Sequence, residues 1–262
     1  MKTEIGKANE MSQRVLITAG ASGIGREIAR AFAANGGRVF VSDIDAGGLD
    51  DLSREIAGAT TRVCDNSKRS DVEALIPAAV EALGGLDVLV NNAGISGPTA
   101  PVEKMDPDKW EEVMNVNLNG TFNITRLAIP HLKKSPAGSI LIMSSLGGRI
   151  VYPNRSPYCV SKWGLIGFAK TLALELGAFN IRANAIAPGV VSGERIERVL
   201  EGRAKAEGKT LEAVTEAAMA IQAIKRFVDP KDIAALCVFI ASDAGKSISG
   251  QILPIDNYSV AS

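Results

Sequence analysis

This sequence has few of the residues on which several common enzyme classes depend. It contains one histidine, His131, among 262 residues. A Ser-His-Asp hydrolase would need His131 as its base, but His131 follows Pro130 late in a helix-like run from about Asp106. We therefore interpret His131 as a helix-end or surface residue, and the sequence favours neither a hydrolase triad nor a histidine-based metal site.

Cysteine is also scarce. Cys64, Cys159 and Cys237 are widely spaced, and none has a second cysteine or a histidine at the spacing of a metal site. We predict three free thiols and no bound metal.

Neither an excess of one charge nor a long apolar run is present. Lys+Arg and Asp+Glu are 29 each, so no basic surplus indicates nucleic acid or an anionic membrane surface. No apolar run approaches the roughly 18 residues of a membrane span, and the segment before Arg14 has no secretion-signal core. These features predict a cytoplasmic protein that binds a small molecule, with neither nucleic acid nor membrane as a partner.

Apolar strands alternate with helical runs along the chain. The pattern predicts strands at residues 14–18, 38–42, 61–64, 86–90, 138–143 and 181–187. Helical connections between strands imply right-handed crossovers, and thus a Rossmann-like, doubly wound parallel α/β sheet with helices on both faces. We expect residues 14–262 to form a single catalytic domain and residues 1–13 a flexible N-terminal extension.

A glycine-rich turn follows the first strand. Residues 19–25 read Ala-Gly-Ala-Ser-Gly-Ile-Gly and precede a helical run, which is the context of a pyrophosphate-binding turn. Asp43 ends the second strand 18 residues after Gly25, near the offset of a ribose-binding carboxylate. Such a carboxylate accepts hydrogen bonds from a ribose 2′-hydroxyl and repels a 2′-phosphate, so we predict NAD rather than NADP.

A tyrosine and a lysine are placed to share a helix face. Tyr158 and Lys162 are four residues apart, and Ser145 lies thirteen residues before the tyrosine. Positions i and i+4 stack on a helix, so the ammonium can lie near the phenol and favour its ionised form. The pair alone is also compatible with a half-buried tyrosine beside a solvated lysine.

Together, these motifs resemble the short-chain dehydrogenase/reductase family, in its single-domain, NAD-dependent type. The resemblance runs from about Arg14 to Asp256 and rests on motifs in the family's order and spacing. These are the glycine turn, Asn91-Asn92-Ala93-Gly94, Asn117, Ser145, Tyr158-x-x-x-Lys162 and Pro188-Gly189.

Two positions depart from the family pattern. The first glycine of the family's Thr-Gly-x-x-x-Gly-x-Gly turn is replaced by Ala19; if that position needs a positive φ, the neighbouring Gly20 is expected to take over the bend. At the C-terminus, Asp256-Asn257-Tyr258 stands where the family has Asp-Gly-Gly.

The resemblance implies a role for each matching residue. Tyr158 would be the general acid/base, Lys162 would assist it and bind the nicotinamide ribose, Ser145 would hold the substrate oxygen, and Asn117 would complete a proton relay through water. Asp65 would hold the adenine. The full set of implied cofactor contacts is Gly20, Ser22, Gly23, Ile24, Gly25, Asp43, Ile44, Asp65, Asn66, Asn92, Ala93, Gly94, Tyr158, Lys162, Pro188, Gly189, Val190 and Val191.

The substrate is less clearly indicated. A charged segment at about 192–226 is expected to form a helical lid, or else a solvated surface helix. Four arginines fall in the loop after Ser145 or in this segment, and they either bind an anionic substrate or are solvated or paired: Arg149, Arg155, Arg195 and Arg198. By resemblance, and because residues 163–176 are apolar on more than one helical face, we expect a homotetramer.

The predicted function is hydride transfer between NAD(H) and a small polar alcohol or carbonyl compound. Two alternatives stay open. One is a 3-oxoacyl-thioester reductase, which Asp43 disfavours because biosynthetic reductions usually use NADPH. The other is a nucleotide-binding scaffold without catalysis, which the complete set of Asn117, Ser145, Tyr158 and Lys162 disfavours.

Overall fold

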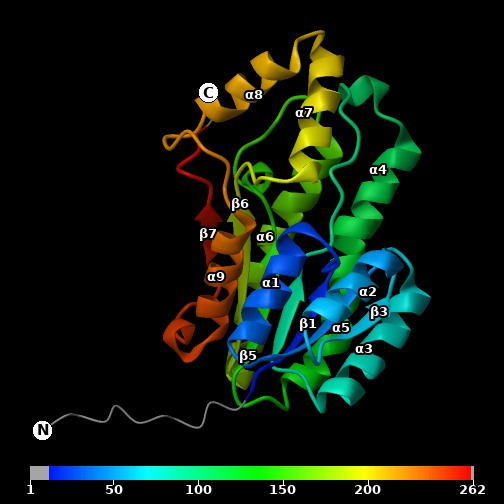
Figure 1. Ribbon diagram of the computed structural model, residues 1–262, viewed down its shortest axis with the longest axis vertical. Coiled ribbons are helices and arrows are strands. Elements are labelled where there is room, and N and C mark those ends of the chain that lie inside the picture. Colours follow the sequence, from blue (N-terminus) through cyan, green and yellow to red (C-terminus); the bar gives the residue numbers. More distant parts are fainter. Residues whose placement is uncertain (1–11, 261–262) are drawn as a thin grey trace, which may run out of the picture.

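The computed structural model describes residues 12–260, which build a seven-stranded parallel sheet in the order β3-β2-β1-β4-β5-β6-β7 (Figure 1). The strands are β1 (Arg14–Thr18), β2 (Arg38–Asp43), β3 (Thr60–Val63), β4 (Val88–Asn91), β5 (Gly138–Met143), β6 (Ile181–Pro188) and β7 (Ile252–Ile255). Most of the predicted N-terminal extension lies outside the described residues. Gln13, at its end, donates from Nε2 to the Ala241 carbonyl at 2.8 Å.

All six predicted strands are present, with ends shifted by one or two residues in four of them. The seventh strand, β7, was not predicted. It is four residues long, contains Pro254 and, among the described residues, pairs only with β6 at the sheet edge. Proline is tolerated on such an edge because no further strand needs its missing N–H, but it hides the strand signal in the sequence.

Both faces of the sheet are covered by helices, as predicted. Successive strand residues point to opposite faces, so Val15 and Ile17 pack in one core and Leu16 in the other. The first core includes α1 (Gly23–Ala34), α2 (Ala46–Glu55) and α9 (Pro230–Ala241); the second includes α3 (Arg69–Leu83), α5 (Gly120–Leu132) and α6 (Ser156–Leu176). This arrangement is the doubly wound fold that the sequence indicates.

The helical run predicted from about Asp106 is present but contains an irregular turn. Asp106 caps α4 (Pro107–Met114), whose first position is a proline, and α5 begins at Gly120. Between them, Asn115–Asn119 form a π-helical turn. The predicted run is therefore helical throughout, and the irregular turn within it carries Asn117.

The segment predicted as a lid forms α7 (Glu194–Glu207) and α8 (Leu211–Ala220). In Figure 1 both helices lie beyond the end of the sheet toward which the β7 arrow points, which is its carboxyl edge. They share a small apolar core formed by Leu200, Ala204, Val214 and Ala218. This placement is compatible with a lid, and its movement stays a prediction.

Short helices complete the description: η1 (Val102–Lys104), η3 (Leu146–Gly148), η4 (Gly177–Phe179) and η5 (Asp243–Gly245). His131 lies in the last turn of α5, and all three cysteines are buried and unpaired. Within residues 12–260, no helix is both long and apolar enough to cross a membrane.

Candidate active site

Side chains lock together the carboxyl ends of β1 and β4. The Thr18 hydroxyl oxygen accepts from the backbone N–H groups of Asn92 at 3.0 Å and Ala93 at 3.1 Å. The Asn92 amide in turn donates to the Ala19 carbonyl at 2.8 Å. The Asn92–Gly94 segment and the glycine turn therefore form one rigid unit. Thr18 was not among the predicted site residues, and only its position at the strand end could have signalled this role.

The glycine turn bends at Ala19 itself. Ala19 has φ +51°, whereas Gly20 is not among the residues with positive φ, so the expectation that Gly20 takes over the bend was wrong. Gly20 is needed for space instead, because a side-chain carbon there would overlap Val41. Holding alanine in the left-handed region costs on the order of 1 kcal/mol, which the anchoring by Asn92 offsets.

The start of α1 is suited to an anion. Ser22 is the N-cap and makes no side-chain capping hydrogen bond, and the first turn of the helix contains no acidic residue. Gly23, with φ +52°, has no atom within 4 Å of the place a side chain would occupy, and Gly25 packs where a side-chain carbon would overlap the Ala19 carbonyl. This leaves N–H groups of the first turn, including that of Ile24, without a capping side chain.

Asp43 lies directly beside this turn. Its Oδ2 accepts from the Ala21 N–H at 2.9 Å, and its Oδ1 accepts from the Asp45 N–H at 3.1 Å. The carboxylate is thereby fixed at the end of β2, and the side chain of the next residue, Ile44, is 72% exposed. These positions suit a ribose hydroxyl and an adenine edge.

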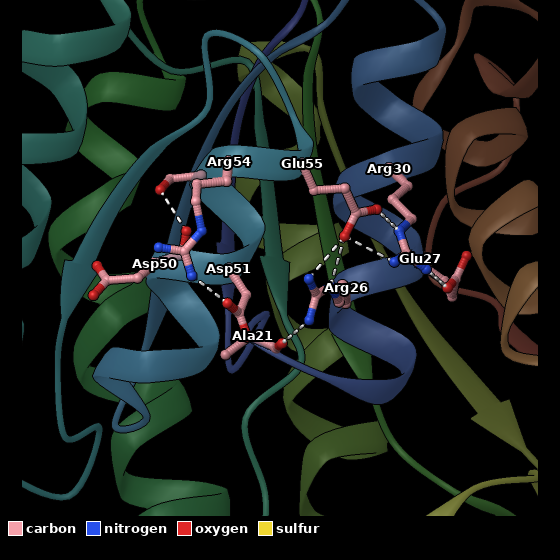
Figure 2. Close-up of polar contacts among 9 residues, drawn as sticks. Ala21, Arg26, Glu27, Arg30, Asp50, Asp51, Arg54 and Glu55 are labelled. Carbon is pink, nitrogen blue, oxygen red and sulfur yellow. Dashed lines mark hydrogen bonds and ion pairs between the residues drawn. The ribbon is translucent and has the colours of Figure 1, made fainter.

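An ion-pair cluster holds α1 against α2 next to the turn (Figure 2). Glu55 accepts from both Arg26 and Arg30, and Arg26 also donates to the Ala21 carbonyl at 3.3 Å. Hydrogen bonding to Arg30, and then to Arg26, outweighs the opposing effect of burial and lowers the pKa of Glu55 to about 2. Both guanidinium groups are therefore engaged by an acid of this chain.

Asp65 and Asn66 follow β3. Burial acts to raise the pKa of Asp65. The hydrogen bonds that its Oδ1 accepts from the Ser67 hydroxyl, at 2.7 Å, and the Ser67 N–H, together with the Lys68 ammonium, outweigh burial and hold that pKa below its usual range. Asn66 is buried, and Gly120, at the start of α5, lies against its carbonyl. Both residues thus lie near the carboxyl edge, on the β3 side of the glycine turn.

Lys162 lies in the centre of the site and is only 2% exposed. Its Nζ donates to the Met143 carbonyl at the end of β5, at 2.8 Å. Burial, with a smaller repulsion from Arg195, lowers the pKa of Lys162 to about 7. Hydrogen bonding to Met143 therefore places a lysine of unusually low pKa at the end of the sheet.

Asn117 lies next to Lys162 because of the π-helical turn. A side-chain carbon at Gly94 would lie 3.1 Å from the Lys162 Nζ and 3.2 Å from the Asn117 Oδ1. The Asn117 amide accepts from the Ile95 N–H at 2.7 Å and donates to the Ile95 carbonyl and the Ser161 hydroxyl, both at 3.0 Å. Its side chain clamps the segment after β4 against α6.

Tyr158 and Ser145 both lie next to Gly147. A side-chain carbon at Gly147 would lie 3.0 Å from the Tyr158 ring, and the Ser145 hydroxyl accepts from the Gly147 N–H at 3.1 Å. The Lys162 Nζ is 5.8 Å from the centre of the Tyr158 ring. The structure therefore brings together Asn117, Ser145, Tyr158 and Lys162, with the ammonium hydrogen-bonded to Met143 rather than directly to the phenol.

The segment after β6 lies at the carboxyl edge of the sheet, where β6 ends. Following Pro188, the Gly189 N–H donates to the Ile255 carbonyl at 3.0 Å, the Val190 carbonyl accepts from Val228, and Val191 also pairs with Val228. Gly189 packs closely on Asp256. These contacts connect residues predicted to bind the cofactor to the C-terminal segment.

The C-terminal departure from the family pattern keeps glycine-like backbone angles. Both Asn257 and Tyr258 have φ +55°, and the Tyr258 side chain is 74% exposed. The Asn257 amide donates to the Arg226 carbonyl at 2.7 Å. This turn therefore connects the end of the sheet to the segment that follows α8.

The four arginines considered as anion-binding residues have different surroundings. Arg149 forms an ion pair with Asp256 at 2.6 Å, and its guanidinium therefore already has a counter-ion within the chain. Arg195 and Arg198 are exposed on α7. Arg155 alone lies against the Tyr158 ring, with its Cζ 5.2 Å from the ring centre.

Comparisons with known proteins agree with this fold. The family described as enoyl-(acyl carrier protein) reductase matches residues 18–257. A D-beta-hydroxybutyrate dehydrogenase from Cupriavidus necator is 37% identical over 94% of this chain and 97% of its own. The 3-oxoacyl-[acyl-carrier-protein] reductase FabG of Thermotoga maritima is 36% identical over 92% of this chain and 95% of its own.

Solved structures also resemble this chain over most of its length. An actinorhodin polyketide ketoreductase with NADPH has a TM-score of 0.89 at 32% identity and covers 94% of this chain and 96% of its own. An NAD⁺-bound xylitol dehydrogenase has a TM-score of 0.89 at 27% identity, covering 93% and 97%. This chain belongs to the short-chain dehydrogenase/reductase family of oxidoreductases. Its relatives include enzymes named for both alcohol oxidation and ketone reduction.

Proposed function

We propose that this protein is an NAD-dependent dehydrogenase that interconverts a small secondary alcohol and its ketone, or a primary alcohol and its aldehyde. The observation that carries the proposal is the meeting of Ser145, Tyr158 and Lys162 beside the unit formed by Asn92–Gly94 and the glycine turn. The uncapped start of α1, the carboxylate of Asp43 and the segment after β6 fit a dinucleotide laid along the carboxyl edge of the sheet. Bound NAD would accept or supply the hydride.

The protein's own part is to move a proton at the substrate oxygen. In oxidation, the phenolate oxygen of Tyr158 takes the proton from the alcohol, and the Ser145 hydroxyl donates a hydrogen bond to the alcohol oxygen. Lys162, whose amino group is fixed by Met143, would contact the nicotinamide ribose, and its protonated form stabilises the phenolate. Asn117 would complete the proton relay through water. Its amide is occupied by Ile95 and Ser161, which supports a positioning part in that relay.

A panel of alcohols assayed for NAD reduction tests this function. Formation of NADH with any of them also excludes the non-catalytic scaffold. The relationship to FabG keeps a 3-oxoacyl-thioester reductase as the second candidate. If the protein is such a reductase, it should oxidise NADPH with an acyl thioester faster than it reduces NAD with any small alcohol.

We expect NAD to be preferred over NADP by at least about tenfold in kcat/KM, or about 1.4 kcal/mol. Asp43 repels a 2′-phosphate, and the cations on α1, Arg26 and Arg30, are engaged by Glu55. Asp43→Ala should narrow the preference, whereas Asp50→Ala, which removes an exposed carboxylate of α2, should not. Equal efficiency of the wild-type protein with both cofactors would overturn the assignment.

We further propose a homotetramer formed by pairing of α5 and α6. Apolar side chains exposed on these helices include Phe122, Val160, Trp163 and Leu174, which is 88% exposed. Light scattering should give about four times the 27.4 kDa of the chain, and Trp163→Glu should reduce that mass. A monomer at all concentrations would refute the proposal.

A further inference from the structure

We propose that Arg155 binds the carboxylate of the substrate, so that the protein acts on a short hydroxy acid or the corresponding keto acid. This inference rests on the proposed dehydrogenase function and names the substrate class for the same site. The Arg155 guanidinium lies beside the Tyr158 ring and has one hydrogen-bond partner among the described residues.

Most of the hydrogen-bonding capacity of Arg155 is unused. Among the described residues the only hydrogen bond of its side chain runs from Nη2 to the Ser96 carbonyl, at 2.9 Å. Its Nε is sealed from solvent without a partner, and the hydroxyl of the next residue, Ser156, is in the same state. A guanidinium has five N–H donors, so Ser96 fixes the orientation of the group and leaves donors for a ligand. A carboxylate is the group that matches two adjacent donors of this fork.

The charge around Arg155 is uncompensated. Within the part of the chain that the structure describes, no ion pair involves Arg155, Arg195 or Lys162. Burial is the main influence on Arg155 and lowers its pKa, and the other groups that influence it most are Tyr158, Cys159, Arg195 and Tyr152, none of which is a carboxylate. A half-buried cation without a counter-ion is costly, and a bound anion would offset that cost.

Arg149 provides an internal contrast. It lies in the same loop but has its own counter-ion, Asp256. The loop therefore pairs one arginine within the chain and leaves unpaired the one nearer to Tyr158. The N-terminal end of α6 has no acidic residue in its first turn and no side-chain cap, so its dipole adds to the attraction for a negative group there.

The geometry also limits the size of the substrate. The reacting hydroxyl belongs at the tip of Tyr158, and the guanidinium lies over the ring of the same residue, 5.2 Å from its centre. The carboxylate must then be only a few bonds from the carbon that gives up hydride. The anion expected at Arg155 is not the pyrophosphate of the dinucleotide, because the glycine turn and the start of α1 are suited to bind that group.

The test compares a hydroxy acid with a neutral molecule of the same shape. The substrates are the two enantiomers of 3-hydroxybutyrate and their methyl esters, assayed for NAD reduction by wild type and by Arg155→Gln. We expect wild type to use one acid at least about tenfold more efficiently in kcat/KM than its ester. In Arg155→Gln the efficiency with the acid should fall by about 10- to 100-fold, equivalent to about 1.4 to 2.7 kcal/mol, and that with the ester by less than about threefold.

Two further variants separate charge recognition from structure. Arg155→Lys should recover part of the activity with the acid, and Arg54→Gln, which removes an exposed guanidinium of α2, should behave as wild type. The NADH affinity of Arg155→Gln should equal that of wild type; a large loss would assign Arg155 to the cofactor and overturn the proposal. An unchanged ratio of acid to ester efficiency in Arg155→Gln would overturn it as well.

A binding measurement keeps the proposal falsifiable if Arg155→Gln does not fold or no alcohol is turned over. Calorimetry of the wild-type complex with NADH should show butyrate binding at least about tenfold more tightly than butyramide. Equal binding of the two would refute the carboxylate site. Activity with neutral alcohols together with equal binding would refute this inference alone, whereas tight butyrate binding without any NAD reduction would refute the proposed function alone.

Discussion

Replacing Tyr158 with phenylalanine is expected to lower kcat by about 10²- to 10⁴-fold and to leave NADH binding unchanged within about twofold. The phenol transfers the proton but contributes little to holding the dinucleotide, so the two effects should separate. Steady-state kinetics with the best alcohol of the panel gives the first, and titration of NADH fluorescence gives the second.

Tyr152 provides the matched control. Its ring also packs near Gly147, but burial raises its pKa, so its hydroxyl stays protonated and is unsuited to act as a base. Tyr152→Phe should therefore reduce kcat far less than Tyr158→Phe. Near wild-type turnover in Tyr158→Phe, or a larger loss in Tyr152→Phe, would remove Tyr158 from the mechanism.

Replacing Lys162 with methionine should damage both kcat and NAD affinity, because one ammonium serves the phenolate and the ribose. We expect losses of about 10²-fold or more in kcat/KM. The same change at Lys170, which is exposed on α6, should have little effect. A loss confined to kcat, with NAD affinity unchanged, would show that the ribose contact is wrong.

Lys162 should also affect the pH dependence of stability. Its pKa is lowered to about 7, whereas in the unfolded chain it returns to about 10.5. Between these values the unfolded state binds a proton that the folded state does not, so the free energy of unfolding gains a contribution that grows as pH rises. Urea unfolding should show wild type becoming more stable relative to Lys162→Met between about pH 7 and pH 10. A difference that did not change with pH would contradict the assignment.

Local patterns were sufficient for most of the fold. Runs of apolar residues in β1 and β5 signal buried strands by themselves, and each is followed by turn residues at the edge where ligands bind. The spacing of Tyr158 and Lys162 fixes their relation because both lie on one regular helix, α6. Where geometry follows from a single element, the sequence was enough to predict it.

Contacts between distant segments were not predictable in this way. The π-helical turn that places Asn117 is stabilised by its clamp on Ile95, which lies 22 residues away in the chain. The positive φ of Ala19 depends on the hydrogen bond from Asn92. Likewise, the four arginines differ in their tertiary contacts: Asp256 pairs with Arg149, whereas no acid within residues 12–260 forms an ion pair with Arg155.

If the proposed function is right, this protein transfers hydride from an alcohol carbon to NAD. The most direct measurement uses a panel of alcohols deuterated at that carbon, including hydroxy acids, polyols and simple secondary alcohols, with mass spectrometry of the nicotinamide product. We expect reduced NAD carrying one deuterium with at least one of them, at a rate that falls in Tyr158→Phe. NAD that binds to the protein but stays oxidised with every alcohol, or is reduced without taking up the label, would contradict it.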